Sequence, residues 1–189
     1  MEIPENLRAE YYDRLKGWAA YSVREKSGQR ILSDLLNVQA EVCCDPTLLL
    51  TADEWSAVEN KKRIKKPYIL IYTVGNEPRL FEYAQKLSKE TGIEVVFLPC
   101  VMEEEYFTGE IVNQYGFKTV AHAAPDEWLS YFENASYVVT ESFHGTVFSL
   151  IKHKPFLVCI DKTDGTTNNR ARELLNICGV TDRDLDASF

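Results

Sequence analysis

Apolar runs and amphipathic stretches alternate regularly along the chain from Pro67 onward. Short runs of Val, Ile, Leu and Phe predict buried strands, whereas apolar residues spaced three and four apart predict helices with one buried face. The expected strands are 68–74, 93–98, 119–121, 137–140 and 155–160. The expected helices are 77–91, 126–134, 145–153 and 170–178. This alternation is typical of βαβ units and predicts an α/β fold, a Rossmann-like, mainly parallel sheet flanked by helices.

The chain before this regular part also carries helical and strand-like segments. The expected helices are 6–16 and 25–36, and the expected strands are 18–23 and 40–44. Thr51, with Glu54 three residues later, predicts a capping box at the start of a short helix. The basic run 61–66 follows, and we place a domain boundary near it. That run is either a solvated connection or a contact for anionic lipid or a lipid-linked substrate.

A polar elbow, residues 140–145, lies between the expected strand 137–140 and an apolar helical pattern. In open α/β sheets such turns lie at the carboxyl ends of strands, where ligands bind. The following helix directs its unpaired N–H groups and the positive end of its dipole toward the elbow. With Ser142 and His144 at this point, the pattern predicts a site for an anion such as phosphate or carboxylate.

The formal net charge of −8 argues against a general nucleic-acid binder, which usually shows a basic stripe. The charge leaves room for an anionic small molecule, because the local field of a pocket can oppose the net charge. The start of the chain lacks the basic and apolar regions of a signal peptide, and no apolar run approaches the ~18 residues of a spanning helix. Nothing in the sequence resembles a P-loop or a metal site, so no metal is expected.

The chain has five cysteines and no C-x-x-C spacing. All of them have largely apolar sequence neighbours; they are Cys43, Cys44, Cys100, Cys159 and Cys178. This pattern predicts buried, reduced thiols in a cytoplasmic protein.

Four segments in order resemble the polysaccharide pyruvyl transferase family. The elbow and its helix (140–149), followed by Lys154-Pro155-Phe156, are similar to a T-D-S-F-H-G-T-x-F-S elbow that precedes a K-P-F strand. The other three segments resemble the S-V-R-E, D-P-x-x-L-L and N-x-R-x-x-x-L-L motifs of the family; they are 22–25, 45–50 and 168–183. Glu141 departs from the pattern, because the family usually has Asp there.

The resemblance implies an activity and its partners. Family members transfer pyruvate from phosphoenolpyruvate onto sugar hydroxyls of a surface polysaccharide or its precursor, usually as a ketal, without a further cofactor. The implied acceptor is a glycan or a lipid-linked sugar, and the implied location is the cytoplasm, with peripheral association at the inner face of the membrane left open.

The resemblance also implies an architecture. The family fold is similar to the two-domain GT-B glycosyltransferases, and the likeness covers about the later half of a member. Residues 1–62 would then be the tail of an N-terminal α/β domain plus a connection, and residues 63–189 a C-terminal Rossmann-like donor-binding domain. An apolar cleft wall left exposed by a missing half would favour self-association into a homo-oligomer.

The elbow supplies three candidate site residues. His144 can donate to phosphate or act as the general acid, or it can only hydrogen-bond the backbone of the turn. Ser142 can bind phosphate or simply cap the helix. Gly145 can allow a close approach of the backbone to a ligand, or it can serve the turn geometry alone.

Three charged residues complete the candidate site. Arg170 can hold a carboxylate through two hydrogen bonds or lie solvated at a helix start. Arg24 follows a strand and can face a ligand or form a structural ion pair. Glu141 can orient His144 or cap the turn locally.

Two other functions stay open on the sequence. A GT-B-type glycosyltransferase would use a nucleotide sugar, but the segment 161–165 is a poor match to the Gly-rich, Glu-containing turn that such enzymes place late in the chain. A non-catalytic, truncated remnant would fold yet bind neither ligand.

Overall fold

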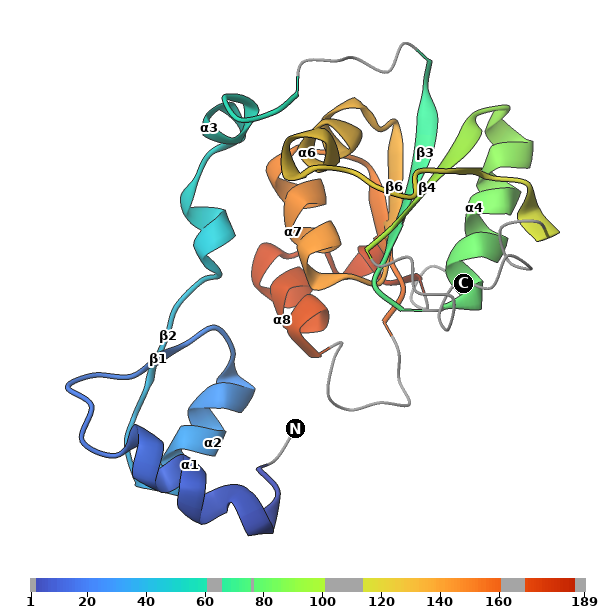
Figure 1. The fold of residues 1–189 in the computed structure, drawn as a ribbon. Coiled ribbons are helices and arrows are strands. Elements are labelled where there is room, and N and C mark those ends of the chain that lie inside the picture. The colour runs from blue at the N-terminus through green and yellow to red at the C-terminus, as the bar shows by residue number, and fades with distance from the viewer. Residues whose placement is uncertain (1–2, 61–65, 76, 101–113, 161–168, 186–189) are drawn as a thin grey trace. The chain divides into compact units, whose positions relative to one another are not determined.

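The computed structural model describes residues 3–60, 66–75, 77–100, 114–160 and 169–185. The chain forms two compact units, Met1–Leu49 and Leu50–Phe189, and each is described by itself (Figure 1). Residues 61–65 of the basic run 61–66 lie outside the described residues, and the domain boundary expected near the run stays a prediction.

The first unit combines short helices with a two-stranded parallel sheet. Its helical elements are η1 (Glu5–Leu7), α1 (Arg8–Leu15), α2 (Lys26–Leu36) and η2 (Pro46–Leu49). The strands β1 (Ser22–Val23) and β2 (Glu41–Val42) pair over two residues only, shorter than the runs 18–23 and 40–44 suggested. A strand extends only as far as a partner satisfies its backbone groups, and the apolar pattern alone does not reveal that limit.

The second unit is a five-stranded parallel sheet with helices on both faces. Its strands are β3 (Tyr68–Thr73), β4 (Glu94–Pro99), β5 (Lys118–Thr119), β6 (Tyr137–Thr140) and β7 (Phe156–Val158). Its helices are α3 (Ala52–Ser56), α4 (Pro78–Thr91), α6 (Pro125–Asn134), α7 (Phe143–Ile151), α8 (Asn169–Cys178) and the short η3 (Thr181–Arg183). The order β5-β4-β3-β6-β7, parallel at every pair, confirms the predicted α/β class and parallel sheet.

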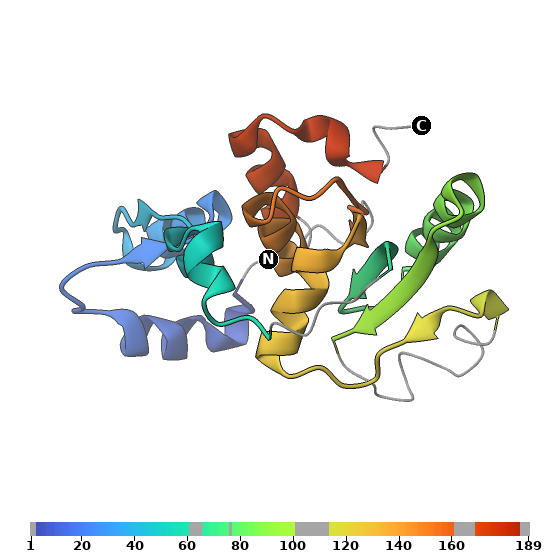
Figure 2. The same cartoon turned by 90° about the horizontal axis from the view of Figure 1, so that it is seen from above.

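Successive residues of β3 face opposite sides of the sheet, and both sides are buried, which explains the almost continuous apolar run of this strand. Ile69 and Ile71 join α4 in a cluster of buried residues with Phe81 and Phe97. The other side is covered by α6 and α7, where the Tyr72 ring packs edge-on against Trp128 and Phe132 (Figures 1 and 2). A strand buried on both faces has no polar side to alternate with.

The strand order places a topological switch point between β3 and β6. From β3 the chain adds β4 and β5 on one side, then returns to add β6 and β7 on the other. All five strands are parallel, so their carboxyl ends meet at one edge of the sheet, where open α/β folds bind ligands. Most of the irregular stretch 100–118 and of the loop 161–169 lies outside the described residues, so a functional role for either segment stays a prediction.

The expectation of five buried thiols is wrong for four of them. Cys159 is buried after β7, but Cys43, Cys44, Cys100 and Cys178 are exposed, and all five are free. Apolar neighbours in sequence do not bury a residue that lies where a strand or helix ends.

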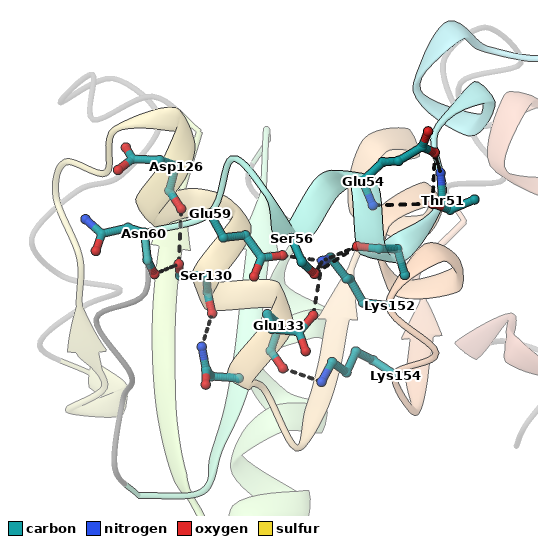
Figure 3. Close-up of polar contacts among 12 residues, drawn as sticks. Thr51, Glu54, Ser56, Glu59, Asn60, Asp126, Ser130, Glu133, Lys152 and Lys154 are labelled. Atoms are coloured by element: carbon teal, nitrogen blue, oxygen red, sulfur yellow. Dashed lines mark hydrogen bonds and ion pairs between the residues drawn. The ribbon is translucent and has the colours of Figure 1, made fainter.

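Lys152 anchors the segment before β3 to the rest of the second unit (Figure 3). Its side chain is 1% exposed, and its Nζ donates to Ser56 Oγ at 3.0 Å and to Ala52 O at 3.3 Å. The same Nζ forms ion pairs with Glu59 and, at 3.1 Å, with Glu133. A buried ammonium group requires such partners because desolvation of an unpaired charge is costly. Residues 51–60 are therefore part of this unit's folded body.

Further backbone contacts continue this attachment toward β3. The Asn60 N–H donates to Asp126 O at 3.1 Å, and the Ser130 hydroxyl donates to Asn60 O. At the other end, Thr51 and Glu54 form the predicted capping box of α3.

We expect Lys152→Met to lower the free energy of unfolding by about 3–5 kcal/mol, because it leaves the Glu59 carboxylate buried without its cation. Chemical denaturation monitored by circular dichroism measures this change. The exposed Lys89→Met is the matched control and should change stability by less than about 0.5 kcal/mol. We expect the double variant Lys152→Met/Glu59→Leu to recover part of the stability that Lys152→Met loses. If the single variant Lys152→Met and the double variant were equally destabilised, the ion-pair explanation would be wrong.

Candidate functional site

The elbow between β6 and α7 is fixed by hydrogen bonds of its own side chains. The Thr140 hydroxyl donates to Tyr72 O at 2.6 Å and accepts the Ser142 N–H at 3.0 Å. Ser142 is the N-cap of α7, and its Oγ accepts the Gly145 N–H at 3.3 Å. The helix therefore begins at Phe143 rather than at Gly145, because the serine cap adds the first two residues to the first turn. Of the two roles expected for Ser142, this geometry provides the capping role.

Gly145, in the first turn of α7, packs against Thr140 at the end of β6. A Cβ atom at this position would lie 2.3 Å from Thr140 Oγ1 and 3.0 Å from Thr140 Cβ. No side chain fits in that space without displacement of the helix from the strand. The glycine is thus explained by helix–strand packing, and a ligand contact is not needed to account for it.

Glu141 bridges the elbow to the end of the neighbouring strand β3. Its Oε1 accepts hydrogen bonds from the Thr73 hydroxyl at 2.7 Å, the Val74 N–H at 2.6 Å and the Gly75 N–H at 2.8 Å. Its Oε2 is buried and has no hydrogen-bond partner among the described residues. Burial raises the pKa of Glu141 above its ordinary value, and the hydrogen bonds from Thr73, Gly75 and Val74 only partly oppose this rise.

Phe143 brings His144 and Arg170 to the same place. The His144 ring lies edge-on to the Phe143 ring, with 5.3 Å between centroids. The Arg170 guanidinium, from the first turn of α8, lies 5.1 Å from the centroid of the same ring. Both side chains are half-buried, so they combine restricted orientation with access to solvent. An imidazole and a guanidinium thus each contact Phe143 in the first turn of α7, and residues of these types suit an anionic ligand.

Arg24 belongs to the first unit, where it forms an ion pair with the buried Asp45. Burial alone would raise the pKa of Asp45, but hydrogen bonds from Thr47 and Arg24 outweigh it and hold the pKa below its ordinary value. This contact fits the structural ion pair expected as one alternative, and a substrate-binding role for Arg24 stays a prediction.

Sequence reasoning missed two parts of this site. Phe143 is not among the candidate site residues of the sequence, although its ring contacts both His144 and Arg170. The turn Thr73–Gly75 is the second part, because the N–H groups of Val74 and Gly75 donate to Glu141. The available signal was the position of this turn directly after the first strand of the regular pattern.

Comparison with known proteins places the chain in a family. The model of the family described as polysaccharide pyruvyl transferase matches residues 2–162, and the chain therefore belongs to that family. No match to a curated protein was found. Among the described residues, no helix is long and apolar enough to span a bilayer.

Two solved structures have partly similar folds. A Listeria monocytogenes protein, named as a UDP-N-acetylglucosamine 2-epimerase, is 12% identical, with a TM-score of 0.47 over 69% of this chain and 43% of its own. The wall teichoic acid polymerase TagF is 11% identical, with a TM-score of 0.46 over 96% of this chain and 53% of its own. The chain thus spans about half or less of the length of these proteins.

We expect Gly145→Ala to destabilise the second unit by about 1–3 kcal/mol, because the added methyl group must displace α7 from Thr140. Urea denaturation measures the change. A variant as stable as the unmodified protein would show that the helix and strand are not as closely packed as described.

We expect the stability difference between the unmodified protein and Glu141→Gln to depend on pH. Because the pKa of Glu141 is higher in the folded protein than in the unfolded chain, folding favours the protonated carboxyl group. Its contribution to the free energy of unfolding is complete below the ordinary pKa of 4.5 and is lost as the pH rises through the pKa of the folded protein. The unmodified protein should therefore be less stable relative to Glu141→Gln at a pH well above 4.5 than at a pH below 4.5. Paired urea denaturation curves at the two pH values test this, and parallel behaviour of the two proteins would contradict it.

Proposed function

We propose that this member of the polysaccharide pyruvyl transferase family binds phosphoenolpyruvate at the elbow after β6 and contributes to transfer of its pyruvyl group to sugar hydroxyls. The observation that carries the proposal is the convergence of His144 and Arg170 on the Phe143 ring at the start of α7. Both side chains can donate hydrogen bonds to an anion, and the dipole of α7 adds to the attraction at this point.

The donor matches this arrangement in its charges. Phosphoenolpyruvate carries its phosphate ester and its carboxylate on the same carbon, C2, so its site needs two sets of donors a few ångströms apart. The guanidinium of Arg170 suits the planar carboxylate, which it can bind through two parallel hydrogen bonds. The first turn of α7 and His144 suit the phosphate.

The reaction requires a proton at the donor. C3 of the enol gains a proton, the cation that develops at C2 is captured by a sugar hydroxyl, and the C2–O bond to phosphate breaks. We assign His144 as the residue that holds this proton or neutralises the departing phosphate, because histidine changes charge near neutral pH. Ser142 contributes by holding the first turn of α7 in place.

The acceptor completes the proposal. A ketal forms when two hydroxyls of one sugar add to C2 in turn, so the acceptor is a glycan or a lipid-linked sugar with two neighbouring hydroxyls. The chain spans about half of the length of structurally similar proteins, and we expect most acceptor contacts to come from residues beyond the described site. We place the reaction in the cytoplasm, where phosphoenolpyruvate is made.

We expect saturable binding of phosphoenolpyruvate to this chain, weakened at least about tenfold in His144→Ala, which corresponds to about 1.4 kcal/mol. Isothermal titration calorimetry measures both affinities. The exposed His122→Ala serves as the matched control and should bind as the unmodified protein does.

Two other results of the same titration would count against the proposal. Binding of a uridine or guanosine diphosphate sugar without phosphoenolpyruvate binding would favour a glycosyltransferase. Binding of neither ligand by a folded chain would contradict a complete donor site within these residues.

A further inference from the structure

The turn on the β3 side of the switch point occupies the place where Rossmann folds usually bind an external anion. In dinucleotide-binding folds the pyrophosphate rests on backbone N–H groups of the turn after the first, central strand. In this sheet β3 has that position, because β4 and β5 extend from one side of it and β6 and β7 from the other. The corresponding N–H groups here are those of Val74 and Gly75.

These donors are already occupied by a carboxylate of the chain itself. Glu141 Oε1 lies 2.6 Å from the Val74 nitrogen and 2.8 Å from the Gly75 nitrogen, and it also accepts from the Thr73 hydroxyl. Burial of the second oxygen, Oε2, costs free energy, since it has no partner among the described residues. The site thus keeps a carboxylate in this turn although its desolvation is unfavourable.

The start of α4, just beyond this turn, carries a second carboxylate. Glu77 is the N-cap of the helix, and its Oε1 accepts the Arg79 N–H at 3.1 Å and the Arg79 Nε–H at 2.9 Å. The Arg79 guanidinium also pairs with Glu77 Oε2 at 2.8 Å, so the start of α4 already holds a carboxylate cap with its own cation. The α7 side instead has the neutral cap Ser142, with His144 and Arg170 beside it.

We propose that Glu141 is a specificity-determining residue: it fills the anion-binding turn after β3, so that donor anions bind only on the α7–α8 side of the switch point. A small donor with one phosphate and one carboxylate fits on that side. A nucleoside diphosphate, which needs the turn for its pyrophosphate, is rejected. The identity of the donor rests on the proposed function, but the filling of the turn does not.

The first arm of the test measures binding of inorganic pyrophosphate by calorimetry to the unmodified chain and to three variants. Glu141→Ala removes the carboxylate and should bind pyrophosphate at least about tenfold more tightly. Glu141→Gln keeps an oxygen acceptor in the turn and should match the unmodified chain. The exposed Glu82→Ala makes the same change in net charge and should also match it.

The second arm needs no variant and uses backbone amide shifts from nuclear magnetic resonance. In the unmodified chain, pyrophosphate and phosphoenolpyruvate should leave the amides of Val74 and Gly75 unshifted, whereas phosphoenolpyruvate should shift those of Phe143 and His144. Saturable shifts at Val74 and Gly75 would overturn the inference even if Glu141→Ala does not fold.

The two arms separate this inference from the proposed function. A folded Glu141→Ala with unchanged pyrophosphate affinity would overturn the role of Glu141, whatever phosphoenolpyruvate does. Absence of any amide shift with phosphoenolpyruvate would contradict the proposed donor, while tighter pyrophosphate binding by Glu141→Ala would still support the filled turn.

Discussion

The parallel pairing of β3 with β6 is the constraint on which the candidate site depends. It sets Tyr72 opposite Thr140 and so brings together two turns that lie nearly seventy residues apart in sequence. The Thr140 hydroxyl closes this junction by donating to Tyr72 O, and Glu141 closes it one residue further on. This junction fixes the backbone at Thr140 and Glu141, and the Ser142 cap then fixes the first turn of α7 as far as Gly145.

The local features of this region could be predicted from sequence. The strand Tyr137–Thr140 and the capping box of Thr51 and Glu54 depend on neighbours within a few residues, and the structure confirms both. The start of α7 was placed two residues late because an aromatic residue and a histidine do not look like a first helical turn. The serine before them was the signal, as an N-cap residue directly precedes the helix.

The long-range features could not be predicted. The partners of Glu141 depend on the strand order, which a single sequence does not specify, and without that order its carboxylate has many possible donors. The four exposed cysteines show the same limit, since their burial depends on what covers the ends of the elements that carry them. The convergence of Arg170 and His144 on Phe143 likewise required knowledge that α8 returns beside α7 (Figure 1).

A strongly acidic chain can still bind an anion if its charges are unevenly distributed over the molecule. Charge interactions at a partly buried site extend over a few ångströms with a reduced dielectric constant, whereas distant surface carboxylates are screened by water and salt. The net charge of −8 therefore says little about the start of α7. Glu141 is held by hydrogen-bond donors at the end of β3, and Glu77 is paired with Arg79, so each carboxylate is stabilised by its own neighbours. The Arg170 guanidinium lies against Phe143 in the first turn of α7, where its positive charge and the positive end of the helix dipole both favour an anion.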